Sequence, residues 1–235
     1  MARRWSGEVR VYFEQYEVGT ATVSVGIKRE LDALENTALG DTAERVLAGI
    51  RKDGIEWSGY FDDSTSFDAF KATNIGSATL VCSVFIGTTT GNRAYGALTR
   101  LYSESVAMAN KGVVMANGSM VPDHTLDRGY VHLLRTTGTG SSSSAAVDGA
   151  AASTGTGFWY LHVFSYAGGG SSVVNLQDSA DDVTYAAVGT QAVSAATAYR
   201  ISVTGTIRRY TRLIWDATGT KSLASMLSRG GTANG

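Results

Sequence analysis

Alternation of apolar and polar residues with a period of two is the feature that most constrains this chain, because it predicts β-strands along most of its length. In residues 8–14 (EVRVYFE), Val9, Val11 and Phe13 occupy one face of such a strand, and the residues between them occupy the other. The run 199–209 (YRISVTGTIRR) alternates in the same way. We therefore expect a mainly β protein.

Signals for helices are few. Residues 64–72 (STSFDAFKA) begin with Ser64, a suitable N-cap, and carry two phenylalanines three positions apart, which predicts one short helix flanking the β-structure. Residues 96–109 fit either a helix face or a strand face, and we interpret them as a strand.

Residues 78–87 (ATLVCSVFIG) are apolar on both faces, as expected of a strand that is buried on both sides. They contain Cys82, the single cysteine of the chain, so an intramolecular disulfide framework is ruled out. Because no histidine or asparagine pattern accompanies it, we expect Cys82 to be a core residue and not a catalytic thiol.

The composition changes at residues 136–157, where every residue except Val147 and Asp148 is Thr, Gly, Ser or Ala. Such a segment can bury little side-chain surface, so it predicts a linker or a long loop. It separates an N-terminal part, residues 1–135, from a C-terminal part, residues 158–235. Short strands divided by Gly and Ser turns in the C-terminal part are typical of a β-sandwich domain.

Charge and motifs exclude several classes of function. The net charge is −1, so the chain lacks the basic excess of a strong nucleic-acid binder. It contains no catalytic or nucleotide-binding motif, and its three histidines have no metal-ligand spacing. We therefore expect no enzyme activity, no cofactor and no metal ion. A surface rich in Gly, Ser, Thr and Ala is suited to close packing between copies of the chain.

Two small clusters leave alternatives open. Residues 177–182 (QDSADD) place three aspartates together and could bind calcium, but the EF-hand spacing is absent and a turn closed by local hydrogen bonds is preferred. Arg208, Arg209 and Arg212 could meet a phosphate or an acidic partner, although a solvated strand face is preferred.

No apolar run is long enough to cross a membrane, and the N-terminus lacks the apolar segment of a secretory signal. We therefore expect no membrane partner, and folding in the cytoplasm in which the chain is made.

Residues 28–63 hold the most organised charge of the chain, with nine acidic and five basic residues. Nothing in the pattern desolvates one pair of carboxylates, as general acid–base catalysis would require. Charges of mixed sign instead fix the register between two protein surfaces. We interpret residues 31–63 as an assembly loop that leads into a core strand, IEWSGYF (55–61).

Residues 33–63 combine this charged loop with Gly-Asp-Thr and Asp-Gly steps, and they resemble the major tail tube protein of long, non-contractile phage tails. Residues 91–114 and 127–134 (DRGYVHLL) are similar to the same family. Residues 177–188 and 203–212 resemble a β-sandwich module found at the end of some of these proteins. The resemblance therefore extends over nearly the whole chain.

The resemblance implies a tail-tube β-sandwich or half-barrel with a short flanking helix, followed by the C-terminal β-sandwich. It also implies that six copies pair their sheets edge to edge into a ring, and that rings stack into a tube in the virion tail. Such a tube would hold the tape-measure protein, pass DNA without sequence-specific binding, and contact tail tip and terminator proteins. The resemblance assigns no ligand to the C-terminal module.

These expectations assign roles to individual residues. The residues expected at the contacts between subunits or rings are Leu31, Leu34, Glu35, Leu39, Asp41, Glu44 and Arg45. We expect Trp57, Phe61 and Cys82 in the core of the subunit, and Trp159 and Tyr185 on the outer surface, available to a ligand.

Two other functions stay open. A capsid decoration protein would form closed trimers in place of open-ended tubes. A carbohydrate- or receptor-binding module would present the rings of Trp159, Tyr160, Tyr166 and Tyr185 to sugars. It would need at least two of these rings on one exposed face, whereas alternation along the strand places Trp159 and Tyr160 on opposite faces.

Overall fold

The computed structural model describes residues 9–18, 22–35, 46–60, 79–107 and 115–229, and these contain strands, turns and bends but no helix. The first eight strands are β1 (Val9–Phe13), β2 (Tyr16–Glu17), β3 (Thr22–Glu35), β4 (Val46–Tyr60), β5 (Leu80–Ile86), β6 (Arg93–Ala107), β7 (Met115–Pro122) and β8 (Asp127–Gly138). The others are β9 (Ser142–Ser143), β10 (Val147–Asp148), β11 (Gly157–Ala167), β12 (Ser172–Ser179), β13 (Ala186–Val193), β14 (Thr197–Val203), β15 (Tyr210–Trp215) and β16 (Thr220–Ser228). The mainly β prediction is confirmed, and residues 96–109 fall largely within β6. The predicted helix, residues 64–72, lies outside the described residues.

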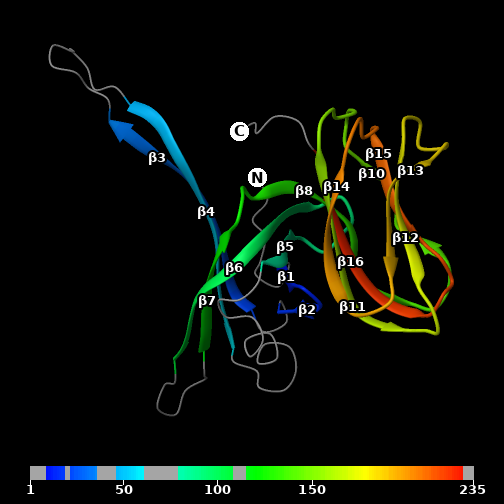
Figure 1. Ribbon diagram of the computed structural model, residues 1–235, viewed down its shortest axis with the longest axis horizontal. Helices are drawn as coiled ribbons and strands as arrows, with labels where there is room; N and C mark the ends of the chain where they lie inside the picture. The colour runs from blue at the N-terminus through cyan, green and yellow to red at the C-terminus, as the bar shows by residue number, and fades with distance from the viewer. Residues whose placement is uncertain (1–8, 19–21, 36–45, 61–78, 108–114, 230–235) are drawn as a thin grey trace.

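The strands form two sheets (Figure 1). The larger sheet follows the order β14-β11-β16-β8-β6-β5-β1-β2, and β7, β4 and β3 continue it from β6. The smaller sheet follows the order β10-β15-β12-β13, with β9 also paired to β15. All the pairings are antiparallel, so this is the class of sheet that can pack one face and leave the other in contact with water.

The N-terminal part of the larger sheet is curled into a half-barrel. Strand β6 makes the bend, because its first half pairs with β5 and β8 while its second half pairs with β7. The register shifts between Leu101 and Ser103, where the strand turns from one part of the sheet to the other. The half-barrel closes around a core that includes Phe13, Trp57 and Met120.

Strand β5 has apolar residues on both faces because it separates two cores. Cys82 and Val84 pack into the core of the half-barrel. Val81 and Phe85 point the other way and pack with Tyr160 and other residues of the C-terminal strands. The two-sided apolar pattern of residues 78–87 therefore corresponds to a strand that is buried on both sides.

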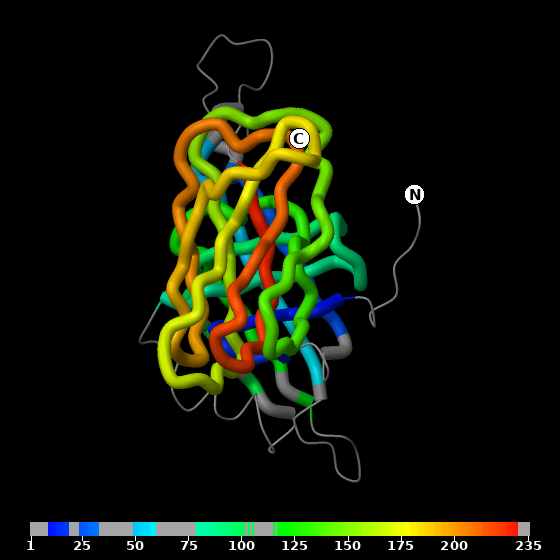
Figure 2. The backbone as a smooth tube through the Cα atoms, turned by 90° about the vertical axis from the view of Figure 1, so that its right-hand side faces the viewer, coloured from blue at the N-terminus to red at the C-terminus, as the bar shows by residue number. Residues whose placement is uncertain are grey.

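The C-terminal strands form a β-sandwich, in which β11, β14, β16 and the end of β8 face the smaller sheet (Figures 1 and 2). Figure 2 has the sandwich toward the viewer and the N-terminal strands behind it. Residues 136–157 lie along the sandwich, since β9 and β10 pair with β15 and Ser153 forms a bridge with Ile207. The proposed boundary at residue 136 falls within β8, which pairs with β6 at one end and β16 at the other.

Candidate subunit interface

Four strand segments form an antiparallel blade, which we define as β3, β4, β7 and residues 101–107 of β6 (Figure 1). Among the described residues, β3 pairs only with β4, so its outer edge is open. Residues 101–107 of β6 pair only with β7 in that same described part, because the pairing of β6 with β5 ends where Thr99 of β6 lies opposite Leu80, the first residue of β5. The blade therefore has two open edges, each carrying unpaired backbone groups of the kind that bind another strand.

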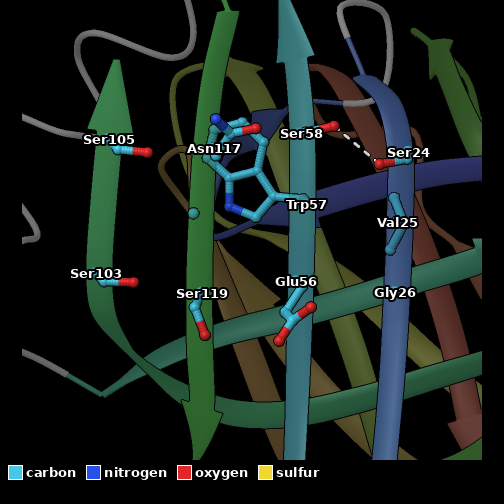
Figure 3. Close-up of a pocket in the computed structure, with 11 residues that line it drawn as sticks. Ser24, Val25, Gly26, Glu56, Trp57, Ser58, Ser103, Ser105, Asn117 and Ser119 are labelled. Carbon is cyan, nitrogen blue, oxygen red and sulfur yellow. Dashed lines mark hydrogen bonds between the residues drawn. The ribbon is translucent and has the colours of Figure 1, made fainter. Parts of the chain in front are cut away.

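The face of the blade that points away from the core carries small polar side chains (Figure 3). The residues on this face come from all four strands: Ser24, Gly26, Glu56, Ser58, Ser103, Ser105, Asn117 and Ser119. The hydroxyls of Ser24 and Ser58 are 2.8 Å apart across β3 and β4. Glu56 is the charged residue in this set, so the face is nearly neutral and weakly negative.

The other face of the blade packs against the core. Ile55 is fully buried and Trp57 is 4% exposed on β4. The indole of Trp57 lies over Gly118, its register partner on β7. A Cβ atom at residue 118 would overlap the indole, so glycine is required there by the close approach of the ring. One face is thus a packed core and the other a bare polar surface.

Past the residues of β4 that pair with β7, residues 28–35 and 46–54 of the blade continue as a two-stranded arm (Figure 1). Its charges pair along the arm: Lys28 Nζ lies 3.1 Å from Glu30, and Lys52 Nζ lies 2.9 Å from Asp32. Both pairs are exposed, so each contributes little stability. An isolated two-stranded ribbon is marginally stable in water.

Two large apolar side chains are exposed on the arm, Leu31 by 56% and Ile50 by 76%. Ile50 and the exposed Val121 of β7 border a hollow at the base of the arm, which Asp123 and His124 also line. Exposed apolar side chains that gather around a hollow mark a contact surface more often than scattered ones do.

The base of the arm is held by Asp53, whose side chain is 2% exposed. One carboxylate oxygen accepts from Arg51 Nε at 2.8 Å, and the other accepts from the backbone N–H of Leu126 at 2.8 Å. Leu126 lies in the corner between β7 and β8. These contacts fix the direction in which the arm leaves the half-barrel.

The structure places some of the predicted interface residues on this arm. Leu31 is exposed on β3, and the backbones of Leu34 and Glu35 lie at the end of the same strand. Four others, Leu39, Asp41, Glu44 and Arg45, lie outside the described residues, as does the predicted core residue Phe61. Their roles stay predictions. Trp57 and the fully buried Cys82 lie together in the core cluster of the half-barrel.

The surface role expected of Trp159 is wrong. Its indole is fully buried in the sandwich core, and its Nε1 donates to Ser225 Oγ at 2.8 Å. Tyr160 is also fully buried, on the opposite face of β11. Tyr185 is half-buried, with the guanidinium of Arg212 3.7 Å from its ring centre. The sugar-binding hypothesis thereby loses two of its four aromatic rings.

Two histidines are buried and serve as structural hydrogen-bonding groups. His162 on β11 bonds to the backbone oxygen of Glu14 at 2.8 Å and to Ser83 Oγ at 2.9 Å. His132 on β8 bonds to Thr211 Oγ1 at 2.7 Å. Burial lowers the pKa of each imidazole to about 4, so both are neutral at pH 7.

The aspartate cluster of residues 177–182 forms a closed turn. Asp181 accepts hydrogen bonds from the backbone N–H of Thr184 and from Ser179 Oγ, and these bonds lower its pKa to about 2. No group of three histidine, cysteine, aspartate or glutamate side chains able to hold a metal ion occurs among the described residues. In the same part of the chain, no helix has the length and apolar character needed to cross a membrane.

The polar face and the open edges of the blade were not anticipated from the sequence. The sequence does carry a signal for the polar face: small polar residues recur at every second position in residues 103–105 (SES) and 117–119 (NGS). Such small polar alternation predicts a strand with one solvated face. It does not reveal which strand will lie at the edge of a sheet, because that depends on pairing between distant segments.

Comparison with known proteins gives no family assignment. No protein-family model and no curated protein matches the chain. Among solved structures, the tail of an empty gene transfer agent particle is similar over 53% of this chain and 97% of that chain, with 15% identity and a TM-score of 0.43.

Two further solved structures are similar. The sheath–tube complex of an extracellular contractile injection system matches over 55% of this chain and 93% of that chain, with 10% identity and a TM-score of 0.43. The Dit protein of phage SPP1, described as part of a hub adsorption apparatus, matches over 93% and 98%, with 8% identity and a TM-score of 0.41. TM-scores below 0.5 do not establish a shared fold, so these matches are likenesses only.

Proposed function

We propose that this chain is a structural subunit of a phage-type tail tube, in which copies join through the edges of the blade into rings and the rings stack. The observation that carries the proposal is the blade itself, with two open edges among the described residues and one bare polar face. Open edges are a hazard for a monomer, and closing them between copies removes the hazard.

The strand directions suit a ring. The blade has the order β3-β4-β7-β6 and every neighbouring pair is antiparallel, so β3 and β6 run in opposite directions. When one copy is rotated into the next about a ring axis, the β6 edge therefore meets the neighbour's β3 edge as an antiparallel pair. Such a head-to-tail contact generates a closed ring when the rotation closes. The copy number of six comes from the resemblance to tail tube proteins.

The polar face would line the lumen of this ring. Its serines, its asparagine and Glu56 offer no basic group to DNA phosphates, and Lys28, further along the same face of β3, is paired with Glu30 at 3.1 Å. A basic lining would bind DNA tightly and in a salt-dependent way, whereas a neutral or acidic lining lets DNA and the tape-measure protein pass. Each ring would carry one Glu56 carboxylate per copy.

The arm would form the contact between successive rings. Its exposed Leu31 and Ile50 provide apolar surface, and its charges of both signs would fix the register. Leu34, Glu35, Leu39, Asp41, Glu44 and Arg45 belong to the same proposal. At the two ends of the tube, the same surfaces would meet the tail tip and terminator proteins.

Electron microscopy of the purified protein at rising concentration tests the proposal. We expect hollow rings or tubes with rotational symmetry, with the sandwich on the outside. Closed trimers would favour the capsid decoration hypothesis. Protein that stays monomeric at every concentration, and in the presence of preformed tube ends, would contradict the proposed function.

A further inference from the structure

We infer the register in which neighbouring copies pair: Ser105 of one copy lies opposite Lys28 of the next, and Ser103 opposite Glu30. This inference rests on the proposed ring. Three constraints on the two open edges lead to it. They are the alternation of side chains between the faces of the blade, the tilt of strands in a barrel, and the extent and charge of the edge strands.

The faces of the blade allow only even shifts. Ser24, Ser58, Asn117 and Ser105 form one row across the four strands. In a ring, Ser105 at the β6 end of this row lies opposite a residue of the neighbour's β3. That residue is either Ser24 or one further along the strand, and we call its separation from Ser24 the displacement. Because side chains alternate between faces, an odd displacement would bring the polar face of one copy against the core face of the next.

The tilt of the strands selects the size of the displacement. A barrel of tilted strands requires its rows to shift along the strands as they go around, and barrel strands usually tilt by about 35–45°. With about 4.8 Å between strands and about 3.3 Å per residue, four strands with a displacement of two residues tilt by about 19°. Displacements of four and six residues correspond to about 35° and about 46°. A displacement of zero or two residues is too small.

The extent of β3 selects the direction. A displacement of four residues toward the arm places residues 103–107 of β6 opposite residues 30–26, all within β3. The same displacement in the other direction would place them opposite residues 22–18, and β3 begins at Thr22. Residues 19–21 lie outside the described residues, and within the described part of the chain only the first direction gives a full strand pair.

The charge of the residue opposite Glu104 decides between displacements of four and six residues. The row of Val25, Trp57 and Gly118 ends on β6 at Glu104. A displacement of four residues sets Glu104 opposite Arg29 of the neighbour, which is exposed and forms no ion pair with another described residue. A displacement of six residues sets it opposite Leu31. Opposite charges across an interface fix its register and exclude alternatives, so four residues is favoured.

Disulfide trapping tests this register directly. Ser105→Cys is combined in four double variants with Ser24→Cys, Gly26→Cys, Lys28→Cys or Glu30→Cys, which represent displacements of zero, two, four and six residues. All five positions are exposed, so the reduced variants should melt like the wild type, and the native Cys82 is fully buried and stays silent. After assembly and mild oxidation, we expect Ser105→Cys with Lys28→Cys to form a covalent ladder, at least about tenfold stronger than the other pairs. The ladder should end at the copy number of the ring.

Each other outcome overturns the register. A ladder from another double variant would replace the displacement and leave the ring intact. Rings in the microscope without a ladder from any pair would show that copies join elsewhere, which leaves the proposed function standing. Cross-linking of Ser105→Cys or Lys28→Cys alone would indicate two-fold pairing and would contradict the ring, as would the absence of rings from the wild-type protein.

A charge exchange gives a second measurement. Arg29→Glu should raise the protein concentration needed for assembly about tenfold, because it faces Glu104 across the joint. Adding Glu104→Arg in the same chain should restore assembly to near the wild-type concentration. Failure of the double variant to restore assembly would overturn the pairing of these two residues.

Discussion

The sandwich and the blade are both built from antiparallel strands, but the sandwich covers its sheets and the blade leaves a face and two edges exposed. In the sandwich, two sheets cover each other and bury Trp159, Leu176 and Leu213 completely. In the blade, one face packs on the core while the other shows serine, glycine and asparagine to solvent, and both edges are open among the described residues. The sandwich is complete within one chain, whereas the open edges of the blade would be completed by another copy in the proposed ring.

Charged groups follow the same division. Lys221 is buried in the sandwich, where its ammonium group donates to Ser172 Oγ at 2.6 Å and to backbone oxygens of Asp216 and Thr218 at 2.8 Å. A buried ammonium group is tolerated only with such full pairing. On the arm, the ion pairs are exposed, and the side chain of Arg29 forms no ion pair with a described residue. The buried charge of the sandwich is therefore satisfied internally, whereas Arg29 of the arm remains available for a partner.

The largest expected effect comes from separating the two regions. Residues 1–135 alone should fail to fold, because β8 would lose its partner β16 and the second face of β5 would lose Tyr160 and Met226. Circular dichroism and amide NMR spectra of this fragment would test the expectation. A fragment with dispersed amide signals would show that the N-terminal part is an independent domain, as the composition break at residue 136 suggests.

A tryptophan in each region tests whether the cores are coupled. Trp57→Ala in the half-barrel and Trp159→Ala in the sandwich should each lower the free energy of unfolding by about 3–5 kcal/mol, since both rings are buried. Val183→Ala, at a side chain that is 79% exposed, should change it by less than about 0.5 kcal/mol. Urea unfolding should show one transition in every variant, because one sheet joins both regions. A Trp57→Ala protein that is as stable as the wild type would argue against a core position for Trp57.

Acid should weaken the contact between the regions. The pKa of His162 is about 4 in the folded protein and about 6.5 in an unfolded chain, so the unfolded state binds more protons between these values. Stability should therefore be constant above pH 6.5 and fall by about 3 kcal/mol for this histidine as the pH drops to about 4. Urea unfolding of the wild type and of His162→Asn at pH 7 and pH 5 measures the difference. An equal loss in both proteins would assign the acid sensitivity to other groups.

The sequence allowed the local structure to be predicted and the global arrangement only in part. Alternation identified the mainly β class, and the apolar pattern of residues 78–87 corresponded to a strand with a core on each side. It misled at Trp159, because alternation assigns Trp159 and Tyr160 to opposite faces of β11 without showing that both faces are buried. The ring of Tyr160 packs on Gly96 of β6, where a Cβ would lie 2.7 Å from it. That contact joins residues 64 positions apart, and no local pattern reports it.

The composition break at residue 136 correctly predicts a long loop, but it does not coincide with a break in the sheet. Small residues in 136–157 make a long loop with two short paired strands, and β8 passes through the predicted boundary. Strand pairing between β8 and β16 connects residues 83 to 99 positions apart, and such non-local pairings are set by the collapse of the whole chain. The open edges of the blade depend on the same non-local information.

The smallest effect on folding, and the most direct test of the arm, is a reversal of charge at Glu35 and in the segment of sequence between β3 and β4. Glu35→Lys, Asp41→Lys and Glu44→Lys together should leave the monomer's melting temperature nearly unchanged, because surface substitutions usually alter stability by less than about 0.5 kcal/mol each. The same variant should fail to form tubes, since reversed charges would repel where the neighbouring ring requires attraction. Thermal unfolding and electron microscopy of one sample measure both quantities. Tubes of normal length from the triple variant would remove the arm from assembly, and the blade edges alone would then have to account for it.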